Sequence, residues 1–393
     1  MMPCGEEVTR KESFTNLSSE LFEIETASLQ ECFLQLNWIC NMKIKHTLLA
    51  ASLLAAISAQ AQNAFTVYGN ADIAINNDVK TATTGIKTEE TSVVPGGMST
   101  SNVGFRGERQ ISTGLKATFQ MEFEVDQTTD TGIVKTRAGL VGLAGNFGAV
   151  TFGRRTTLAK AAIDALDAND AVNTAGFIGD NARDSRRNDM ITYSTPNFSG
   201  FSADVQLGLG APTRITSAAG VVTQDGKSED TSSVGLNYSN GPLMVKWVND
   251  SIKNYSRAVS VAGYSVAVPT GIASRKNEAI GATYDLGVAK LYFVDTKMKQ
   301  GTDATLVKFD TQTLGLRAPM GNFTLVAEAG TGKAKLTTSA IQADVDAMQV
   351  ALFYTLAKDT TLFGIYGTES IAHPSFLKKA EQKQTHVGIR YRF

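Results

Sequence analysis

The last residues of the chain restrict its fold more than any other segment. Apolar and polar or glycine positions alternate there up to the final residue, in the order Val387, Gly388, Ile389, Arg390, Tyr391, Arg392 and Phe393. Because successive side chains of a β-strand point to opposite faces, this pattern predicts a strand with one apolar face that ends where the chain ends. Such an edge promotes aggregation unless a partner strand covers it. The segment therefore predicts a terminal strand that is paired inside a larger sheet.

The same alternation recurs along most of the chain. The clearest case is residues 115–125, where six apolar residues alternate with Lys116, Thr118, Gln120, Glu122 and Glu124. A soluble sandwich does not normally keep charged residues on the second face through strand after strand, whereas a membrane barrel does. Short turns alternate with longer polar segments at residues 77–100, 211–230, 251–275 and 332–343. We predict an all-β fold, an antiparallel transmembrane β-barrel of about 16 strands, an even number as closure expects.

Residues 42–61 have the organisation of a secretory signal peptide. A short basic run at 42–46 precedes an apolar run at 47–57, and Ala59 and Ala61 are the small residues that a signal peptidase reads. The apolar run is shorter than the roughly 20 residues that a helical membrane span needs. We expect cleavage after Ala61 and a barrel of residues 62–393. Residues 1–41 are interpreted as a non-native leader from an upstream start, with a genuine leader extension as the alternative.

The composition argues against catalysis and against cofactors. All three cysteines (Cys4, Cys32 and Cys40) precede the signal, and only His373 and His386 follow it. The mature chain therefore has no disulfide framework, zinc cluster or thiolate nucleophile. Gly-x-Ser-x-Gly and His-Glu-x-x-His motifs are absent from the sequence. We expect no enzyme activity, no metal and no cofactor, and the nearly balanced charge predicts no nucleic-acid partner.

Three motifs resemble those of the general porins of β-proteobacteria and neisseriae. Residues 101–108, followed by 114–117, are similar to the second hairpin of these proteins, and residues 139–143, 145–148 and 152–154 are similar to the third. The aromatic ending, with Tyr391 and Phe393, is similar to their closing strand and assembly signal. The resemblance covers nearly all of residues 62–393.

This resemblance implies an outer-membrane channel for passive diffusion of small hydrophilic solutes and ions. It also implies a homotrimer, insertion by the barrel-assembly machinery, and contact with outer-membrane lipid and lipopolysaccharide. The main alternative is a substrate-specific channel with a saturable binding site. An outer-membrane hydrolase and a soluble secreted β-protein are further alternatives, which the scarcity of histidine and the closing aromatic residue respectively disfavour.

The longest connection, residues 156–188, is the candidate functional segment. Loops of this length in a compact domain are usually functional or disordered. In the porins that the chain resembles, this loop folds inward as a constriction, and its acidic residues face arginines on the barrel wall. The resemblance implies that Asp164, Asp167 and Asp170 are these acidic residues.

The same resemblance implies that Arg154 and Arg186 are wall arginines. Asn102 stands where enterobacterial relatives have arginine, so we predict that Arg106 and Arg137, on adjacent strands, supplement the row. The arginines favour anions, and the aspartates oppose this preference.

Overall fold

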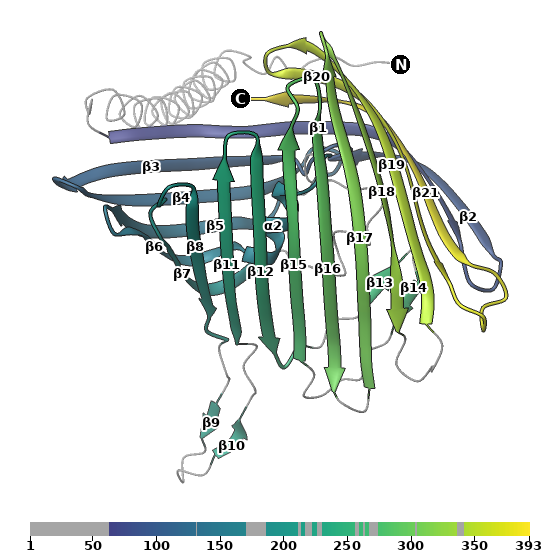
Figure 1. The fold of residues 1–393 in the computed structure, drawn as a ribbon, viewed down its shortest axis with the longest axis horizontal. Helices are drawn as coiled ribbons and strands as arrows, with labels where there is room; N and C mark the ends of the chain where they lie inside the picture. Colours follow the sequence, from purple (N-terminus) through teal and green to yellow (C-terminus); the bar gives the residue numbers. More distant parts are fainter. Residues whose placement is uncertain are drawn as a thin grey trace, which may run out of the picture. The chain divides into compact units, whose positions relative to one another are not determined.

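The computed structural model describes residues 63–130, 132–169, 186–210, 214–216, 222–225, 230–255, 259–261, 264–266, 274–302, 305–335 and 342–393. The predicted leader and signal peptide lie outside these ranges. The segment from Asn63 to Phe393 forms one compact unit, which consists almost entirely of antiparallel strands (Figure 1).

The strands form a closed barrel with 16 positions around the ring, as predicted. In order around the ring they are β1 (Asn63–Thr81), β2 (Lys87–Pro95) together with β3 (Asn102–Ser112), β4 (Leu115–Asp126), β5 (Gly132–Gly145), β6 (Gly148–Thr156), β7 (Arg186–Ser194), β8 (Phe201–Gly208), β11 (Thr231–Asn240), β12 (Leu243–Lys253), β15 (Ser274–Asp285), β16 (Lys290–Thr302), β17 (Thr305–Met320), β18 (Phe323–Lys335), β19 (Gln342–Ala357), β20 (Thr360–Ala372) and β21 (Ala380–Arg392). Two separate hairpins are β9 (Arg214–Thr216) with β10 (Val222–Asp225), and β13 (Val259–Val261) with β14 (Tyr264–Val266).

The first and last strands join to close the ring. β21 pairs with β1 from Glu381 opposite Thr81 to Arg392 opposite Asn70. Beyond this register, the N–H of Gly69 donates to the carbonyl oxygen of Phe393 at 3.0 Å, and the N–H of Phe393 donates to the carbonyl oxygen of Gly69 at 3.1 Å. The prediction that the terminal strand is covered by a partner is confirmed.

β2 and β3 share the other edge of β1. β2 pairs with residues 73–81 of β1, and β3 pairs with residues 63–70. Between β2 and β3 the chain turns inward, where the backbone N–H groups of Met98 and Ser99 donate to the Asp72 carboxylate at 3.2 and 2.8 Å. The two short strands therefore act as one interrupted wall strand.

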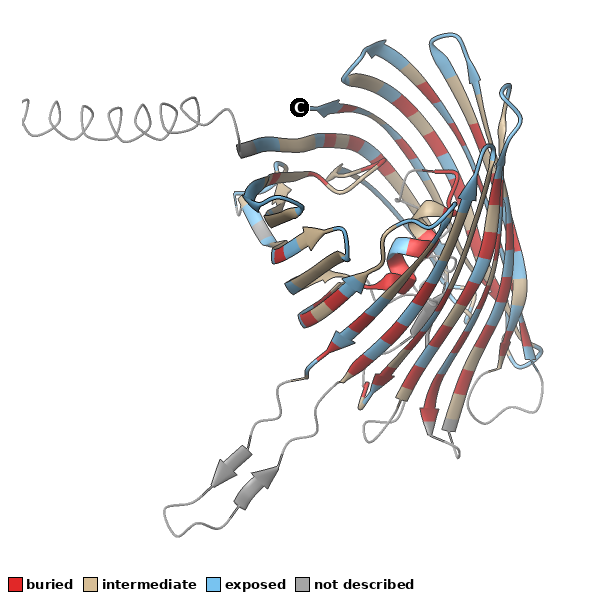
Figure 2. Ribbon diagram, turned by 60° about the vertical axis from the view of Figure 1, so that its left-hand side comes forward, coloured by how far each residue is buried: buried red, intermediate tan, exposed pale blue. Residues whose placement is uncertain are grey.

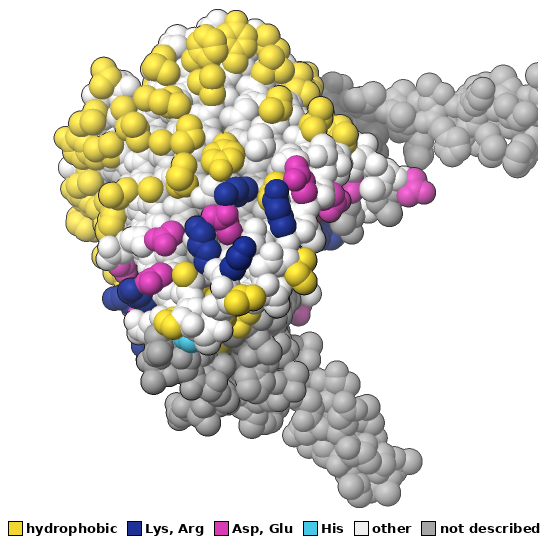
Figure 3. All heavy atoms as spheres, turned by 90° about the vertical axis from the view of Figure 1, so that its right-hand side faces the viewer, with side chains coloured by type: hydrophobic (Ala, Val, Ile, Leu, Met, Phe, Trp, Pro, Cys, Tyr) yellow, Lys and Arg dark blue, Asp and Glu magenta, His cyan; other side chains and the backbone are white. Residues whose placement is uncertain are grey.

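Side chains alternate between the outer face and the lumen along each strand, as the striped ribbon in Figure 2 shows. In β21, Val387 is 60% exposed on the outer face, whereas Arg390 is 4% exposed on the inner one. Figure 3 shows a broad zone of hydrophobic side chains on one outer face, with Lys, Arg, Asp and Glu gathered beside it. An apolar belt with a charged rim is what a barrel needs to sit in a lipid bilayer.

The predicted loop over residues 77–100 is wrong, because the strands extend past the apolar belt. β1 continues to Thr81, and β2 occupies Lys87–Pro95. Polar side chains lie on both faces of this hairpin, and the Asn77 amide donates to Thr91 Oγ1 at 3.0 Å. Without an apolar face the segment shows no period-2 pattern, so the sequence favours a loop.

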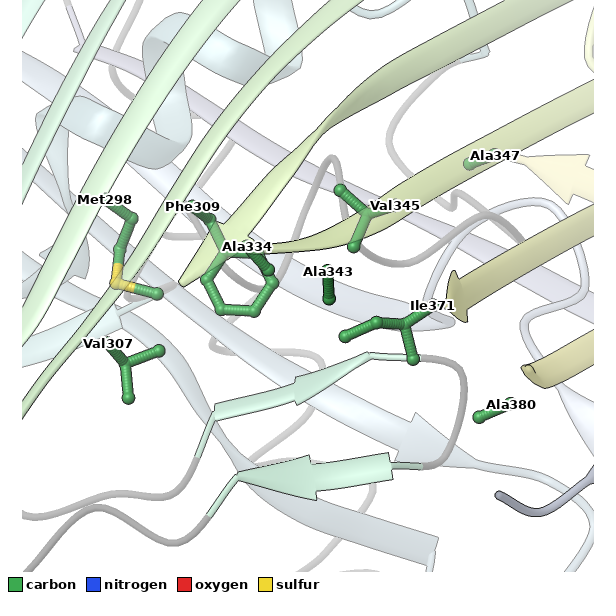
Figure 4. Close-up of a cluster of buried hydrophobic side chains, with 9 residues drawn as sticks. All are labelled: Met298, Val307, Phe309, Ala334, Ala343, Val345, Ala347, Ile371 and Ala380. Atoms are coloured by element: carbon green, nitrogen blue, oxygen red, sulfur yellow. The ribbon is translucent and has the colours of Figure 1, made fainter. Parts of the chain in front are cut away.

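The inner wall is apolar where other parts of the chain pack against it. Figure 4 shows one such cluster, made by Met298, Val307, Phe309, Ala334, Ala343, Val345, Ala347, Ile371 and Ala380. Tyr264 of β14 and Phe376 pack against this cluster, and their ring centroids lie 4.9 Å apart. This part of the lumen is therefore filled by side chains.

No helix in the described part of the chain is long and apolar enough to cross a membrane.

Candidate functional site

A helix begins directly after β6 at the start of the longest connection. This helix, α2 (Leu158–Ala165), has the sequence LAKAAIDA, which contains strong helix formers and neither glycine nor proline. Thr157 is its N-cap, and the Thr157 hydroxyl accepts a hydrogen bond from the N–H of Lys160 at 3.3 Å. This contact satisfies one of the free N–H groups of the first turn.

One face of α2 is buried against the inner barrel wall. Its apolar side chains, which include Ile163, form one cluster with Val248 of β12, Ala279 of β15 and Val294 of β16. Gly281 of β15 allows the close approach, because a Cβ at that position would lie 2.8 Å from Leu166 Cδ1. The apolar face therefore holds the segment inside the barrel, where Figure 2 shows the buried helix.

The residues after α2 are attached to a more distant part of the wall. The N–H of Ala168 donates to Glu328 Oε1 of β18 at 2.9 Å, and Arg317 Nη1 of β17 donates to the carbonyl oxygen of Ala168 at 3.0 Å. Gly315 of β17 lies beneath this contact, since a Cβ there would come within 3.0 Å of Ala168 Cβ. Residues 157–169 thus line the inner wall from β11 to β18.

Charged side chains lie on α2 and where the chain returns to the wall. Lys160 Nζ and Asp164 Oδ1 form an ion pair at 2.7 Å within the helix. Arg186, the first residue of β7, interacts electrostatically with Asp164 and also with Glu122 and Glu124 of β4. The helix and the wall of β4 and β7 therefore share one charged region.

A second group of charges lies on β3, β4 and β5, beside Tyr68 of β1. Arg137 Nε donates to Glu122 Oε1 at 2.5 Å, and its Nη1 donates to Glu124 Oε2 at 3.4 Å. The Tyr68 hydroxyl donates to Glu122 Oε2 at 3.0 Å, and the guanidinium of Arg106 lies 5.2 Å from the Tyr68 ring centroid. Tyr68 therefore contacts Arg106 directly and is connected to Arg137 through Glu122.

The expectation that Arg106 and Arg137 occupy adjacent strands is wrong. Arg106 is in β3 and Arg137 is in β5, with β4 between them. The register of β5 against β4 shifts next to Glu122, so that Arg137 is an extra residue between Thr136 and Ala138. This bulge places Arg137 beside the lumenal Glu122, because a bulge locally disturbs the alternation of faces.

A third group of charges lies on β6, β8 and β12, connected by Asn237 of β11. Asp204 of β8 interacts electrostatically with both Arg155 of β6 and Lys246 of β12. Asn237 of β11 connects these groups, since its amide donates to Asp204 Oδ2 at 2.9 Å and its carbonyl accepts from Lys246 Nζ at 2.7 Å. Arg155 also lines a lumenal cavity of about 420 Å³ together with Arg106. The cations therefore continue around the wall from β3 to β12.

Arg154 and Arg155 differ in their strand phase. Arg154 follows Phe152 by two residues, so alternation places both on the same face of the strand, and Phe152 is 52% exposed on the outer face. Its guanidinium donates to the carbonyl oxygen of Thr136 at 2.7 Å and to Asn188 Oδ1 at 2.6 Å. Arg155 has the lumenal phase and donates to Thr151 Oγ1 at 2.6 Å. Sequence reasoning did not select Arg155, although counting the alternation from Phe152 points to it.

The three predicted loop aspartates have different surroundings. Asp164 is on α2 and pairs with Lys160. Asp167 is buried, and its Oδ1 accepts from the N–H of Asn169 at 2.8 Å. Asp170 lies outside the described residues. In the described part of the chain, no group of three or more His, Cys, Asp or Glu residues is placed to hold a metal ion.

These features together define a class of protein. A closed antiparallel barrel has no free strand edge, so it satisfies its backbone hydrogen bonds without water and can span a lipid bilayer. An apolar outer belt and a charged lumen that contains a folded segment are the properties of a transmembrane β-barrel pore.

Comparisons with known proteins agree with this class. A family model described as Gram-negative porin matches residues 47–370. The chain is 30% identical over 336 residues to outer membrane porin protein 32 of Delftia acidovorans, covering 82% of this chain and 88% of that protein. It is 28% identical to an outer membrane porin protein of Bordetella pertussis, covering 89% and 100% of the two chains. Among solved structures, an anion-selective porin from Comamonas acidovorans has a TM-score of 0.69 and 25% identity, covering 84% of this chain and 100% of that one.

The chain belongs to the Gram-negative porin family. It is an outer-membrane channel for the passive diffusion of small hydrophilic solutes and ions. The predicted fold, function and location are confirmed, and the family and the relatives compared are channels rather than enzymes.

Proposed function

We propose that residues 157–169 form the constriction of this channel and that its lumen prefers anions. The observation that carries the proposal is the row of lumenal cations held by neutral partners. Arg106 lies over the Tyr68 ring, Arg155 donates to a threonine hydroxyl, and Lys246 donates to an asparagine carbonyl. A neutral hydrogen-bond partner does not cancel the charge of a cation, so the cation can still attract a passing anion.

The carboxylates near this row do not balance it. Asp204 interacts electrostatically with Arg155 and with Lys246, so one carboxylate serves two cations. Arg137 differs, because Glu122 and Glu124 contact it directly. An excess of one sign of charge along a water-filled channel with low-dielectric walls raises the local concentration of the opposite ion. The similarity to a solved porin named as anion-selective supports this assignment.

The constriction is proposed to include Arg106, Arg137 and Arg186 on the wall and Asp164 on the loop. Asp164 and Arg186 interact across the space between α2 and β7. Opposed charges create a transverse field, which orients dipolar solutes and makes apolar solutes displace ordered water. Arg154, Asp167 and Asp170 stay as predicted members of the site.

The test is a planar-bilayer recording of the refolded chain under a potassium chloride gradient. We expect large ohmic steps and a reversal potential whose sign corresponds to chloride as the more permeant ion. A reversal potential of the opposite sign would contradict the anion preference. Small currents that one solute blocks saturably would instead favour a substrate-specific channel.

The mature form is proposed to be residues 62–393, assembled as a homotrimer. Residues 42–61 support the first part, because they have the basic, apolar and small-residue regions of a signal peptide. The extensive apolar outer face supports the second part, since it leaves area for contacts between protomers. N-terminal sequencing of protein isolated from outer membranes tests the cleavage site, and conductance steps that occur in triplets test the trimer.

A further inference from the structure

Four lysines form one row on the outer face of the barrel, near the end that carries the long connections. They are Lys276 of β15, Lys299 of β16, Lys308 of β17 and Lys335 of β18, and each stands directly opposite the next in the register of the sheet. Alternation places them on the outside, because each lies an even number of positions from an outward residue of its strand, as Lys299 does from the exposed Phe293. The row therefore places four positive charges on four neighbouring strands.

No carboxylate within the row balances these charges. The row continues into Ser251 of β12 and Gln342 of β19, which are both neutral. In the described part of the chain, none of the four lysines has an ion-pair partner. Like charges directly opposite one another destabilise a sheet. The row therefore weakens the free barrel, and an anion bound along the row would remove the repulsion.

The next row toward the apolar belt has the mixed composition of an ordinary solvated surface. Lys297, Asp310, Lys333 and Asp344 follow one another in register, so that the signs alternate, and Lys333 pairs with Asp344. Lysine also protects exposed strand edges from aggregation, but β15–β18 are paired on both sides. Neither a mixed solvated surface nor the protection of an edge accounts for the four-lysine row.

A groove in the outer wall lies on the same strands, within the apolar belt. Its main part has a volume of about 690 Å³, and its lining surface is almost entirely apolar. A second part, of about 590 Å³, shares the side chains of Phe293, Leu314, Ala329 and Met348 with the first and continues past Thr331 toward the loop end. The groove therefore runs from the apolar belt toward the charged zone of the outer face.

The groove and the lysine row are aligned along the strands. On each of β16, β17 and β18, a lysine of the row and an apolar side chain of the groove are six positions apart, as Lys308 and Leu314 are. At roughly 3.3 Å per residue this separation is about 20 Å, and the flexible lysine stems can shorten it by extending along the apolar surface. An amphipathic molecule with hydrocarbon chains in the groove would direct its headgroup toward the row.

We propose that the outer wall of β15–β18 is a docking surface for a lipid of the outer membrane that bears phosphate groups on its headgroup. Its hydrocarbon chains lie in the groove, and its phosphates contact Lys276, Lys299, Lys308 and Lys335 directly, without a bridging divalent cation. Basic clusters at the border of the hydrocarbon layer are a common means of recognising anionic headgroups. The proposal is independent of the constriction and of the anion preference, because these side chains face away from the lumen.

The experiment measures the unfolding temperature of the refolded chain in a neutral detergent, with lipid A that carries two phosphates as the probe. A ligand that binds only the folded state stabilises it, so we expect lipid A to raise this temperature and monophosphoryl lipid A to raise it less. In the double variant Lys299→Gln with Lys308→Gln, we expect the apparent affinity for lipid A to fall by about thirtyfold, from the usual contribution of a lysine beside an anionic lipid surface. Without lipid, this variant unfolds at the same or a higher temperature, because a repulsion is removed.

The matched control removes the same charge from lysines that are already paired. Lys87 pairs with Glu89 and Lys116 pairs with Glu108, so we expect Lys87→Gln with Lys116→Gln to keep the affinity for lipid A. The variant Lys299→Arg with Lys308→Arg keeps the cations and retains binding. An equal loss of affinity in the control would show that net charge alone attracts the lipid, and this would overturn the proposal.

Two further conditions separate direct lipid binding from other sources of phosphate affinity. Binding persists in the presence of EDTA if the lysines contact the phosphates directly; its loss would show that a divalent cation bridges the lipid to carboxylates such as Asp310 and would overturn the direct contact. Inorganic phosphate at the same phosphate concentration is expected to give no stabilisation. Equal stabilisation by inorganic phosphate would overturn the assignment of the surface to a lipid.

The groove has its own test. Ala329→Phe fills the groove while leaving the four lysines in place, so we expect weaker binding of lipid A. Ala117→Phe, on the apolar face of β4, adds the same ring outside the groove and is the control. An unchanged affinity in Ala329→Phe would contradict the placement of the hydrocarbon chains.

Discussion

Two neighbouring arginines on β6 show how much depends on a single position. Arg155 faces the lumen beside Thr151, whereas Arg154 shares the phase of the outward Phe152. We predict that Arg155→Ala lowers the preference for chloride over potassium by about fourfold. One unit charge about 10 Å away in water changes the energy of each ion by about 0.4 kcal/mol, and the change has opposite signs for chloride and potassium. The measurement is the reversal potential in a salt gradient.

Arg154→Ala is the matched control at the residue scale, because it removes the same charge one position away. Its guanidinium donates to the carbonyl oxygen of Thr136 and to Asn188. We expect a smaller shift of the reversal potential than for Arg155→Ala. An equal or larger shift would show that Arg154 faces the permeating ions and that counting the alternation along β6 assigns its side chain to the wrong face.

At the scale of the element, α2 depends on its buried apolar face. Ile163 is 1% exposed and packs in the cluster with Val248, Ala279 and Val294. We predict that Ile163→Ala weakens the attachment of the helix by about 2–5 kcal/mol, the usual loss for removing a buried aliphatic side chain. The expected result is greater open-channel noise and faster cleavage of the loop by an added protease.

Ile280→Ala is the control for this element, since Ile280 is 46% exposed on the outer face of β15. We expect Ile280→Ala to leave channel noise and proteolysis unchanged. If both variants behave alike, the packing of α2 does not hold the loop.

The sequence predicted a long functional connection here, but not the helix within it. LAKAAIDA is too short to be a stable helix alone. The helix is stabilised only when its apolar face packs against an apolar patch on the wall. That patch comes from Val248, Ala279 and Val294, which belong to three different strands. In the sequence these residues alternate with outward apolar ones, so nothing marks them as a docking surface.

At the scale of the whole molecule, closure of the ring depends on the last residue. Phe393 exchanges backbone hydrogen bonds with Gly69, and a Cβ on Gly69 would lie 2.6 Å from the Phe393 ring. We predict that deletion of Phe393 destabilises the seam between β21 and β1 by about 1–3 kcal/mol, from two hydrogen bonds at about 0.5–1.5 kcal/mol each. The measurement is the folded fraction after refolding in detergent, read from heat-dependent mobility on gels.

Phe147→Ala is the control for the deletion, because Phe147 is an exposed aromatic residue in a turn between β5 and β6. We expect Phe147→Ala to refold like the unmodified chain. A folded fraction that is unaffected by loss of Phe393 would contradict the role of the terminal residue in closing the barrel.

The sequence alone determined the barrel, the outward faces of its strands and the segment that closes it. These properties depend on the period-2 alternation, which each strand carries locally and which Val387, Ile389 and Tyr391 display at the terminus. Only the tertiary structure decided which lumenal charges meet. A register shift in β5 brings Arg137 to Glu122, and Ala168 contacts Glu328 across 160 positions of sequence. Alternation fixes the face on which a side chain lies, whereas bulges and the path of the folded loop fix its neighbours.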